Sequence, residues 1–169
     1  MRIETERLVI RQFTGEMAWD VHRNSLDEDT ARFVPDEVFG TVEKARETVE
    51  YLMAQYGRTD GPLVYPVFLK PDMRNIGYVQ MVPVEGGEWE IGYHIAKGDT
   101  GHGYASEAVQ AFLPAMASRL GISRVFGICL KENRASEHVL RKCGFEPVFE
   151  GTGDYQGRKR EIFRGVWTV

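Results

Sequence analysis

Apolar residues recur at helical spacing in the first half of the chain. After Thr41, the residues Ala45, Val49 and Leu52 lie three and four positions apart, as on one face of a helix. Thr41 has the side chain of a typical N-cap, so we expect this helix to begin directly after it. A shorter helix is predicted from residues 14–15 to about residue 24.

Two further helices are predicted in the second half. Apolar residues keep helical spacing from Ala105 to Leu120, and Gly121 is a natural helix terminator. Pro114 lies inside that pattern, which predicts a kink or a helix shorter than its pattern. A short helix is expected after Asn133, ending at Gly144.

Stretches rich in apolar and β-branched residues alternate with these helices and predict strands. Glu85–Gly87 connects two of them as an antiparallel hairpin, and Pro66 favours an edge or a bulge over a central ladder. The predicted fold is α+β, a mostly antiparallel sheet with helices against its faces, in a single domain over residues 1–169. The predicted strands cover residues 7–13, 63–70, 76–84, 88–96, 123–131, 145–151 and 160–169.

Composition narrows the classes of function. A length of 169 residues with 43% hydrophobic residues suits one domain with a real core. The net charge of −4 predicts no nucleic-acid partner, and no apolar run reaches the ~18 residues of a membrane span. The N-terminus lacks the apolar segment of a signal peptide, so a cytoplasmic protein is expected. Two cysteines, Cys129 and Cys143, predict neither a disulfide framework nor a metal site.

Three glycines within residues 98–103 directly precede the predicted helix at residue 104, in the stretch KGDTGHGYASEAVQAF. A helix N-terminus offers unpaired N–H groups to an anion, and glycines let a phosphate approach them. The P-loop pattern fails because Tyr104 and Ala105 follow the last glycine, and the dinucleotide fingerprint fails at Ser106. A simple turn and a diphosphate held by backbone groups both remain open.

The stretch Thr100 to Ala105 resembles the Q/R-x-x-G-x-G/A loop of the GNAT superfamily of acyl-CoA-dependent N-acetyltransferases. Gly103 and Ala105 agree with that pattern, whereas Thr100 replaces the usual Gln or Arg, although its hydroxyl can still donate to a phosphate. The segments ETERLVIR, EIGYHI and NRASEHVLRKCGFE resemble, in order and spacing, the branch that includes the ribosomal-protein N-terminal acetyltransferases.

The resemblance implies a GNAT-like twisted sheet, splayed in the middle, with helices on both faces, and acetyl-CoA as co-substrate. Local cations must compensate the charge of CoA, and the candidates are His102, Lys131, Arg134, Arg141 and Lys142. The implied cofactor-binding residues are Ile95, Ala96, Lys97, Thr100, Gly101, His102, Gly103, Tyr104, Ala105, Ser106 and Asn133.

Strand alternation over residues 88–95 puts Glu90 on the face opposite the apolar residues, where this branch often carries a glutamate near the amine. Glu90 is therefore the candidate base, with Glu88, His94 and Glu161 as alternates. Many relatives use a tyrosine as the acid toward the leaving thiolate, but that position holds Leu140 here. Ser136 stands where this branch carries a serine near the CoA sulfur.

The predicted activity is transfer of an acetyl group from acetyl-CoA to a primary amine, by direct attack and without an acyl-enzyme. A non-catalytic CoA-binding sensor or scaffold is the alternative. The acceptor is a small-molecule amine or a protein N-terminus, and a monomer or homodimer is expected. The acidic stretch LDEDTARFVPDE, residues 26–37, is interpreted as an exposed loop that can also attract a cationic amine.

Overall fold

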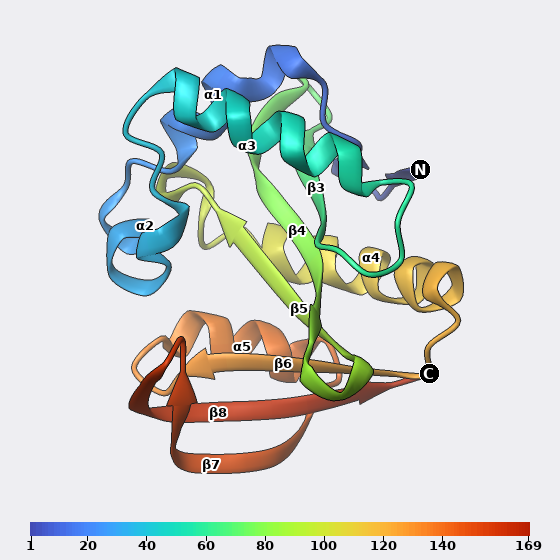
Figure 1. The fold of residues 1–169 in the computed structure, drawn as a ribbon, viewed down its shortest axis with the longest axis vertical. Helices are drawn as coiled ribbons and strands as arrows, with labels where there is room; N and C mark the ends of the chain where they lie inside the picture. The colour runs from blue at the N-terminus through green and yellow to red at the C-terminus, as the bar shows by residue number, and fades with distance from the viewer.

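The computed structural model describes residues 1–169. Its strands form one eight-stranded sheet in the order β1-β2-β3-β4-β5-β6-β8-β7 (Figure 1). The strands are β1 (Arg2–Glu4), β2 (Leu8–Arg11), β3 (Leu63–Leu69), β4 (Arg74–Val84), β5 (Glu88–Ile95), β6 (Arg124–Leu130), β7 (Glu146–Tyr155) and β8 (Arg158–Thr168). The helices are α1 (Ala18–Asn24), α2 (Glu28–Phe33), α3 (Val42–Gln55), α4 (Tyr104–Leu120) and α5 (Arg134–Lys142).

The sheet is splayed between β5 and β6. This is the one parallel pair, and it has only two register partners, Glu90 with Phe126 and Ile91 with Gly127. Strand β5 continues to Ile95 without a strand partner on that edge, and Figure 1 shows β5 and β6 diverging from their meeting point. The remaining pairs are antiparallel, including the hairpin of β4 and β5. The predicted α+β, GNAT-like sheet is confirmed.

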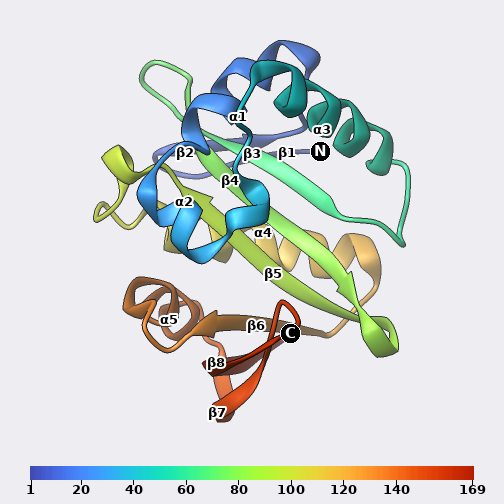
Figure 2. The ribbon, with the colours of Figure 1, turned by 60° about the vertical axis from the view of Figure 1, so that its left-hand side comes forward.

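Two apolar cores lie on the two faces of the sheet. Phe112 of α4 and Leu140 of α5 belong to the larger core, together with buried residues of β2 to β6. Val49 of α3 and Phe13 belong to a smaller core on the other face, against β2 and β3. Because β3 has helices on both faces, it is apolar almost throughout, and Figure 2 shows the sheet between α1 and α3 above and α4 behind.

Helix α4 runs from Tyr104 through Pro114 to Leu120, so of the two predicted effects of Pro114, a kink or a shorter helix, the shorter helix is wrong. A proline removes the hydrogen bond to the carbonyl four residues earlier, here that of Gln110. Gln110 and Pro114 are both exposed, so water can satisfy that carbonyl. Gly121 then ends the helix in the left-handed conformation, as predicted.

The interpretation of residues 26–37 as an exposed loop is wrong. The segment contains α2 and a 3-10 turn at Pro35–Glu37. Asp27 caps α2, because its carboxylate accepts from the amide of Thr30 at 2.8 Å. Thr30 is only 2% exposed, so α2 is packed against the body of the protein.

The other local predictions have mixed outcomes. Thr41 and Asn133 accept hydrogen bonds from the first turns of α3 and α5, which confirms both caps. Pro66 has no partner on β2, and the pairing of β3 with β4 shifts register nearby, between Val67 and Phe68. Such a position suits a proline, which has no amide hydrogen to donate to a neighbouring strand. The short edge strand β1 was not predicted. No helix has both the length and the apolar character needed to cross a membrane.

Candidate active site

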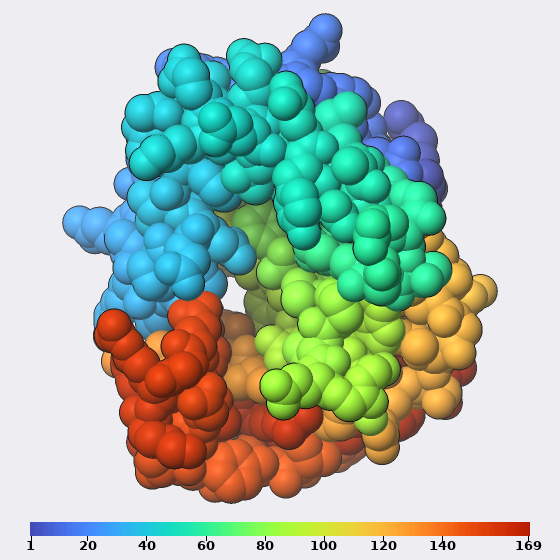
Figure 3. Space-filling model, in the orientation of Figure 1, coloured from blue at the N-terminus to red at the C-terminus, as the bar shows by residue number.

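A cleft of about 1010 Å³ opens where β5 and β6 diverge. Its walls come from β5, the N-terminal turns of α4 and α5, the segment around α2, and the turn that joins β7 to β8. Figure 3 shows the opening between the blue segment around α2, the red turn after β7 and the green β4–β5 hairpin. We call the part at Thr100–Ser106 the loop end and the part at Glu37 and Glu90 the carboxyl end.

The loop end presents free backbone donors. Gly101 and Gly103 have φ values of +81° and +80°, which L side chains rarely adopt. Gly103 is the N-cap of α4, and no side chain caps the helix there. The amides of residues 104–106 donate no hydrogen bond within the protein. An anion at this helix end would therefore meet several N–H groups and the positive end of the helix dipole.

Arg7 fastens this loop to the N-terminal segment. Its guanidinium donates to the Glu107 carboxylate at 2.7 Å through Nε and to the His102 carbonyl at 3.0 Å through Nη1. The same group lies over the ring of Tyr104, 4.6 Å from its centroid. Thr5 also donates to Glu107, at 2.5 Å. These contacts explain physically why the ETER segment and the glycine loop occur together.

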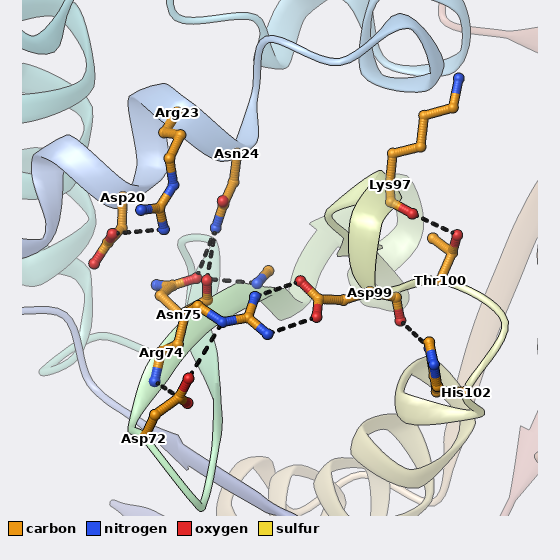
Figure 4. A network of polar contacts seen from close by, with 11 residues as sticks. Asp20, Arg23, Asn24, Asp72, Arg74, Asn75, Lys97, Asp99, Thr100 and His102 are labelled. Atoms are coloured by element: carbon orange, nitrogen blue, oxygen red, sulfur yellow. Dashed lines mark hydrogen bonds and ion pairs between the residues drawn. The ribbon is translucent and has the colours of Figure 1, made fainter.

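A second ion pair supports the start of the loop. Arg74 donates to both carboxylate oxygens of Asp99, at 2.6 and 2.8 Å, as drawn in Figure 4. These hydrogen bonds hold the pKa of Asp99 below its usual range. Thr100 donates its hydroxyl proton to the Lys97 carbonyl at 2.8 Å, so the proton that was expected to face a phosphate is used within the loop.

Two of the five candidate cations are neutralised by neighbours. Lys131 lies 3.1 Å from Glu137 and 2.9 Å from Glu150. Arg141 contacts the same two carboxylates at 2.9 and 2.7 Å. Neither cation lines the cleft, so both serve this quartet rather than an anionic ligand.

Arg134 and Lys142 line the cleft and make no ion pair. His138 lies between them on α5 and also lines the cleft, although it was not among the candidates. The three residues are spaced by four, which places them on one helix face, and that spacing could have identified His138. His102 is exposed, stacks on Tyr104 with centroids 5.4 Å apart, and does not line the cleft.

Glu90 faces the cleft from β5. Trp89 and Ile91, its chain neighbours, are buried in the larger core on the opposite face, as alternation predicts. Burial raises the pKa of the Glu90 carboxyl to about 7, and the charge of Arg164 acts in the other direction. The carboxyl is therefore able to gain or lose a proton near neutral pH.

Two of the three alternate bases lie elsewhere. Glu88 forms an ion pair with Arg124 and does not line the cleft. Glu161 is exposed on β8 and accepts a hydrogen bond from Thr152. Both positions place their carboxylates away from the cleft.

His94 lines the carboxyl end of the cleft. Its Nε2 lies 2.7 Å from the hydroxyl of Thr30 and 3.5 Å from a carboxylate oxygen of Asp27. Its ring stacks on Tyr78 with centroids 5.8 Å apart, and burial lowers its pKa. The contacts with α2 make His94 the link between β5 and that helix.

Ser136 lies in the first turn of α5 and lines the cleft. Its amide donates to Asn133 Oδ1 at 3.1 Å. The Tyr93 hydroxyl lies 2.9 Å from both the hydroxyl and the carbonyl oxygen of Ser136, so its one proton can be donated to either. Strand alternation places Tyr93 on the face opposite Glu90, so sequence reasoning missed its hydroxyl as a feature of the site.

Glu37 and Tyr155 are further residues of the carboxyl end that were not predicted. Burial raises the pKa of Glu37 to about 7, with Asp36 adding to the shift and Gln80 opposing it. Burial also raises the pKa of Tyr155, and the charges of Glu90 and Glu37 raise it further. The pKa of the Tyr155 phenol therefore depends on the charge of both carboxyls. Residues 26–37 had been interpreted as a loop, so no pattern pointed to Glu37.

Most of the predicted site residues meet at this cleft. Ala96, Lys97 and His102 do not line it: the Ala96 amide donates to the Ile76 carbonyl at 2.8 Å, and Lys97 pairs with Glu28 at 3.2 Å. The residues that line it are Glu90, Ile95, Thr100, Gly101, Gly103, Tyr104, Ala105, Ser106, Asn133 and Ser136.

Comparison with known proteins gives the family. The model of the acetyltransferase (GNAT) domain matches residues 7–146. The chain belongs to the GNAT acetyltransferase family. It is 30% identical over 145 residues to the uncharacterized N-acetyltransferase YnaD of Bacillus subtilis, covering 85% of this chain and 82% of YnaD.

Solved GNAT structures have the same fold. A GNAT-family acetyltransferase from Bacillus anthracis is 27% identical, with a TM-score of 0.83 over 99% of this chain and 98% of that one. RimL, a ribosomal L7/L12 alpha-N-protein acetyltransferase solved with coenzyme A, is 20% identical, with a TM-score of 0.85 over 100% of this chain and 98% of that one.

This GNAT domain departs from the superfamily pattern at two places. Leu140, at the position where many GNAT enzymes have a tyrosine, is 1% exposed and belongs to the larger core. Thr100, in place of Gln or Arg, bonds within its own loop. The hydroxyl pair of Tyr93 and Ser136 lies beside the cleft instead, contributed by β5 and α5.

Proposed function

We propose that this GNAT protein transfers an acetyl group from acetyl-CoA to a primary amine by direct attack in a ternary complex. The observation that carries the proposal is one cleft with unpaired helix amides at its loop end and the Glu90 carboxyl, with a pKa of about 7, at its other end. Two proteins of the same fold support acetyl-CoA as the co-substrate. RimL was solved with coenzyme A, and the microcin C7 self immunity acetyltransferase MccE was solved with acetyl-CoA and AMP.

The diphosphate of acetyl-CoA would bind the free amides of residues 104–106. Arg134, His138 and Lys142 form the nearest unpaired basic face and would meet the remaining phosphate. The amides of the pantetheine arm would pair with β5 beyond Ile91, on the edge toward β6, where its backbone has no strand partner. Cofactor binding in this scheme relies on backbone groups more than on side chains.

An alkylammonium acceptor has a pKa of roughly 10 and an N-terminal ammonium one of roughly 8, so either must lose a proton before attack. Glu90 would accept that proton, directly or through a water molecule. The nitrogen then forms a bond to the thioester carbon as the carbon–sulfur bond breaks. The Ser136 hydroxyl would donate a hydrogen bond to the departing thiolate, and Tyr93 holds that hydroxyl in place.

The burial and the raised pKa of both cysteine thiols disfavour a mechanism through an acyl-enzyme on cysteine. Burial raises the pKa of Cys129 and of Cys143 to about 11, so neither is a ready nucleophile at neutral pH. Cys129 is 2% exposed and Cys143 7%. Incubation with labelled acetyl-CoA and no amine should leave the protein unlabelled, and stable labelling would contradict direct attack.

The test of the proposal is Glu90→Gln, assayed as release of the CoA thiol. We expect kcat/KM to fall by roughly 10²- to 10⁴-fold, the usual contribution of a positioned base. In the unmodified protein kcat/KM should rise with pH through about 7 as Glu90 loses its proton, and in the variant only the smaller rise from Glu37, whose pKa is also about 7, should remain. Glu88→Gln on the same strand is the matched control, because Glu88 pairs with Arg124 away from the cleft.

Two outcomes would contradict the proposal. An unchanged kcat/KM in Glu90→Gln would remove Glu90 from the role of base. Binding of acetyl-CoA, seen as a thermal shift, without thiol release across a broad amine panel would instead identify the non-catalytic CoA-binding module.

A further inference from the structure

A second cavity, of about 290 Å³, adjoins the carboxyl end of the cleft. It lies between β4 and the helices α1 to α3, on the face of the smaller core. Glu37, Tyr78, Gln80 and His94 line both this cavity and the cleft, so the two spaces share a wall. Its apolar walls include Phe13, Val21, Phe39, Val49, Leu52 and Val64.

The size of the cavity suits one compact apolar group. An apolar protein cavity of about 150 Å³ is enough to bind benzene. The observed volume of about 290 Å³ thus has room for an aromatic ring with a short chain, or for a branched alkyl group. Burial of such a group in an apolar pocket is favourable in proportion to the area removed from water.

The charged groups around this cavity favour a cation at its mouth. No lysine or arginine lines it, and its ionisable residues are Asp36, Glu37 and His94. His94 is bonded to Thr30, and Glu37 forms no ion pair. The Glu37 carboxylate, on the wall shared with the cleft, is therefore the available partner for an ammonium group.

We propose that the cavity seats the side group of the acetyl acceptor while Glu37 holds its ammonium in the cleft that Glu90 also lines, so that the preferred acceptors are primary amines with one compact apolar group. This inference rests on the proposed acetyl transfer and specifies its acceptor. The chemistry is shared by a free arylalkylamine and by a polypeptide whose first residue is large and apolar.

Two matched pairs of acceptors distinguish these sources. The thiol-release assay would compare 2-phenylethylamine with ethylamine, and a peptide that begins with Phe with the same peptide beginning with Ser. The apolar member of at least one pair should have a kcat/KM roughly 10- to 100-fold higher, as expected for burial of one apolar group. The pair that shows the larger ratio identifies the source.

The cavity itself is tested by Thr48→Phe, which adds an aromatic ring at a lining position on α3. The preference for the apolar acceptor should fall at least tenfold, while turnover of ethylamine and the thermal shift with acetyl-CoA remain. Glu47→Phe is the control, because Glu47 is exposed on the same helix and does not line the cavity.

Glu37→Gln tests the ammonium contact with almost no change in size. It should raise the KM for the preferred amine about tenfold, whereas Glu50→Gln, an exposed residue of α3, should not. Equal turnover of both members of each pair, unchanged by Thr48→Phe and Glu37→Gln, would overturn this inference and leave acetyl transfer intact. Absence of turnover with every amine would overturn the proposed function instead.

Discussion

The loop end of the cleft contains matched charges, whereas the carboxyl end contains carboxyls without ion-pair partners. Arg7 and Arg74, which support the loop, are paired with Glu107 and Asp99. Glu37 and Glu90 lie in a wall with no such partner, and burial raises the pKa of each to about 7. The difference suits a loop end that holds a fixed shape and a carboxyl end that exchanges protons with the acceptor in the proposed reaction.

The largest expected effect concerns the shape of the loop end. In Gly103→Val a β-branched residue must adopt a φ of +80°, although the space is free, with the nearest atom 3.7 Å from the added Cβ. We expect CoA affinity, measured by calorimetry, to fall by roughly 10- to 100-fold, or about 1.4–2.7 kcal/mol. Gly98→Val is the control, because that glycine has no positive φ and open space around it. Unchanged affinity in Gly103→Val would reduce the loop to a simple turn.

The next effect concerns stability at the carboxyl end. The folded pKa of Glu90 is raised to about 7 from 4.5, so the folded state holds this proton more tightly and stability falls as pH rises from about 4.5 to 7. Glu90→Gln should therefore raise the free energy of unfolding at pH 8 by roughly 1–2 kcal/mol and change it little at pH 4. Urea unfolding at the two pH values checks this.

At the loop end, Asp99→Asn should change the free energy of unfolding in the opposite direction, measured by the same urea unfolding. Arg74 lowers the folded pKa of Asp99, so the ion pair contributes stability above pH 3.8 that is lost as pH falls through the folded pKa. This variant should be less stable than the unmodified protein at pH 8. If both variants moved stability in the same direction, the contrast between the two ends would be wrong.

The smallest effect is expected from Thr100→Ala. It removes one hydrogen bond, from the threonine hydroxyl to the Lys97 carbonyl. A neutral hydrogen bond contributes about 0.5–1 kcal/mol, so CoA affinity should weaken only about two- to fivefold. Thr100→Ser keeps the hydroxyl and should bind like the unmodified protein. A loss as large as that expected for Gly103→Val would mean that the hydroxyl contacts the phosphate after all.

The parts of the protein that were predicted correctly depend on neighbours close in sequence. The caps at Thr41 and Asn133 and the end of α4 at Gly121 follow from local backbone chemistry. Alternation along β5 placed Glu90 opposite Trp89 and Ile91 for the same reason. Helix α2 was missed because six residues form a marginal helix alone, and tertiary contacts such as that of Thr30 with His94 stabilise it.

The sequence by itself determined the elements other than β1 and α2, the caps at Thr41 and Asn133, the glycine loop and the face of β5 that carries Glu90, because each depends on a periodicity or a conformation within a few residues. Only the tertiary structure decided which charges are paired, where the sheet splays, and that Glu37 lines both an apolar cavity and the cleft that Glu90 faces. Most of those features join segments 25 to 100 residues apart, such as Arg74 with Asp99 and Arg7 with Glu107, and they depend on burial, which shifts the pKa of a carboxyl.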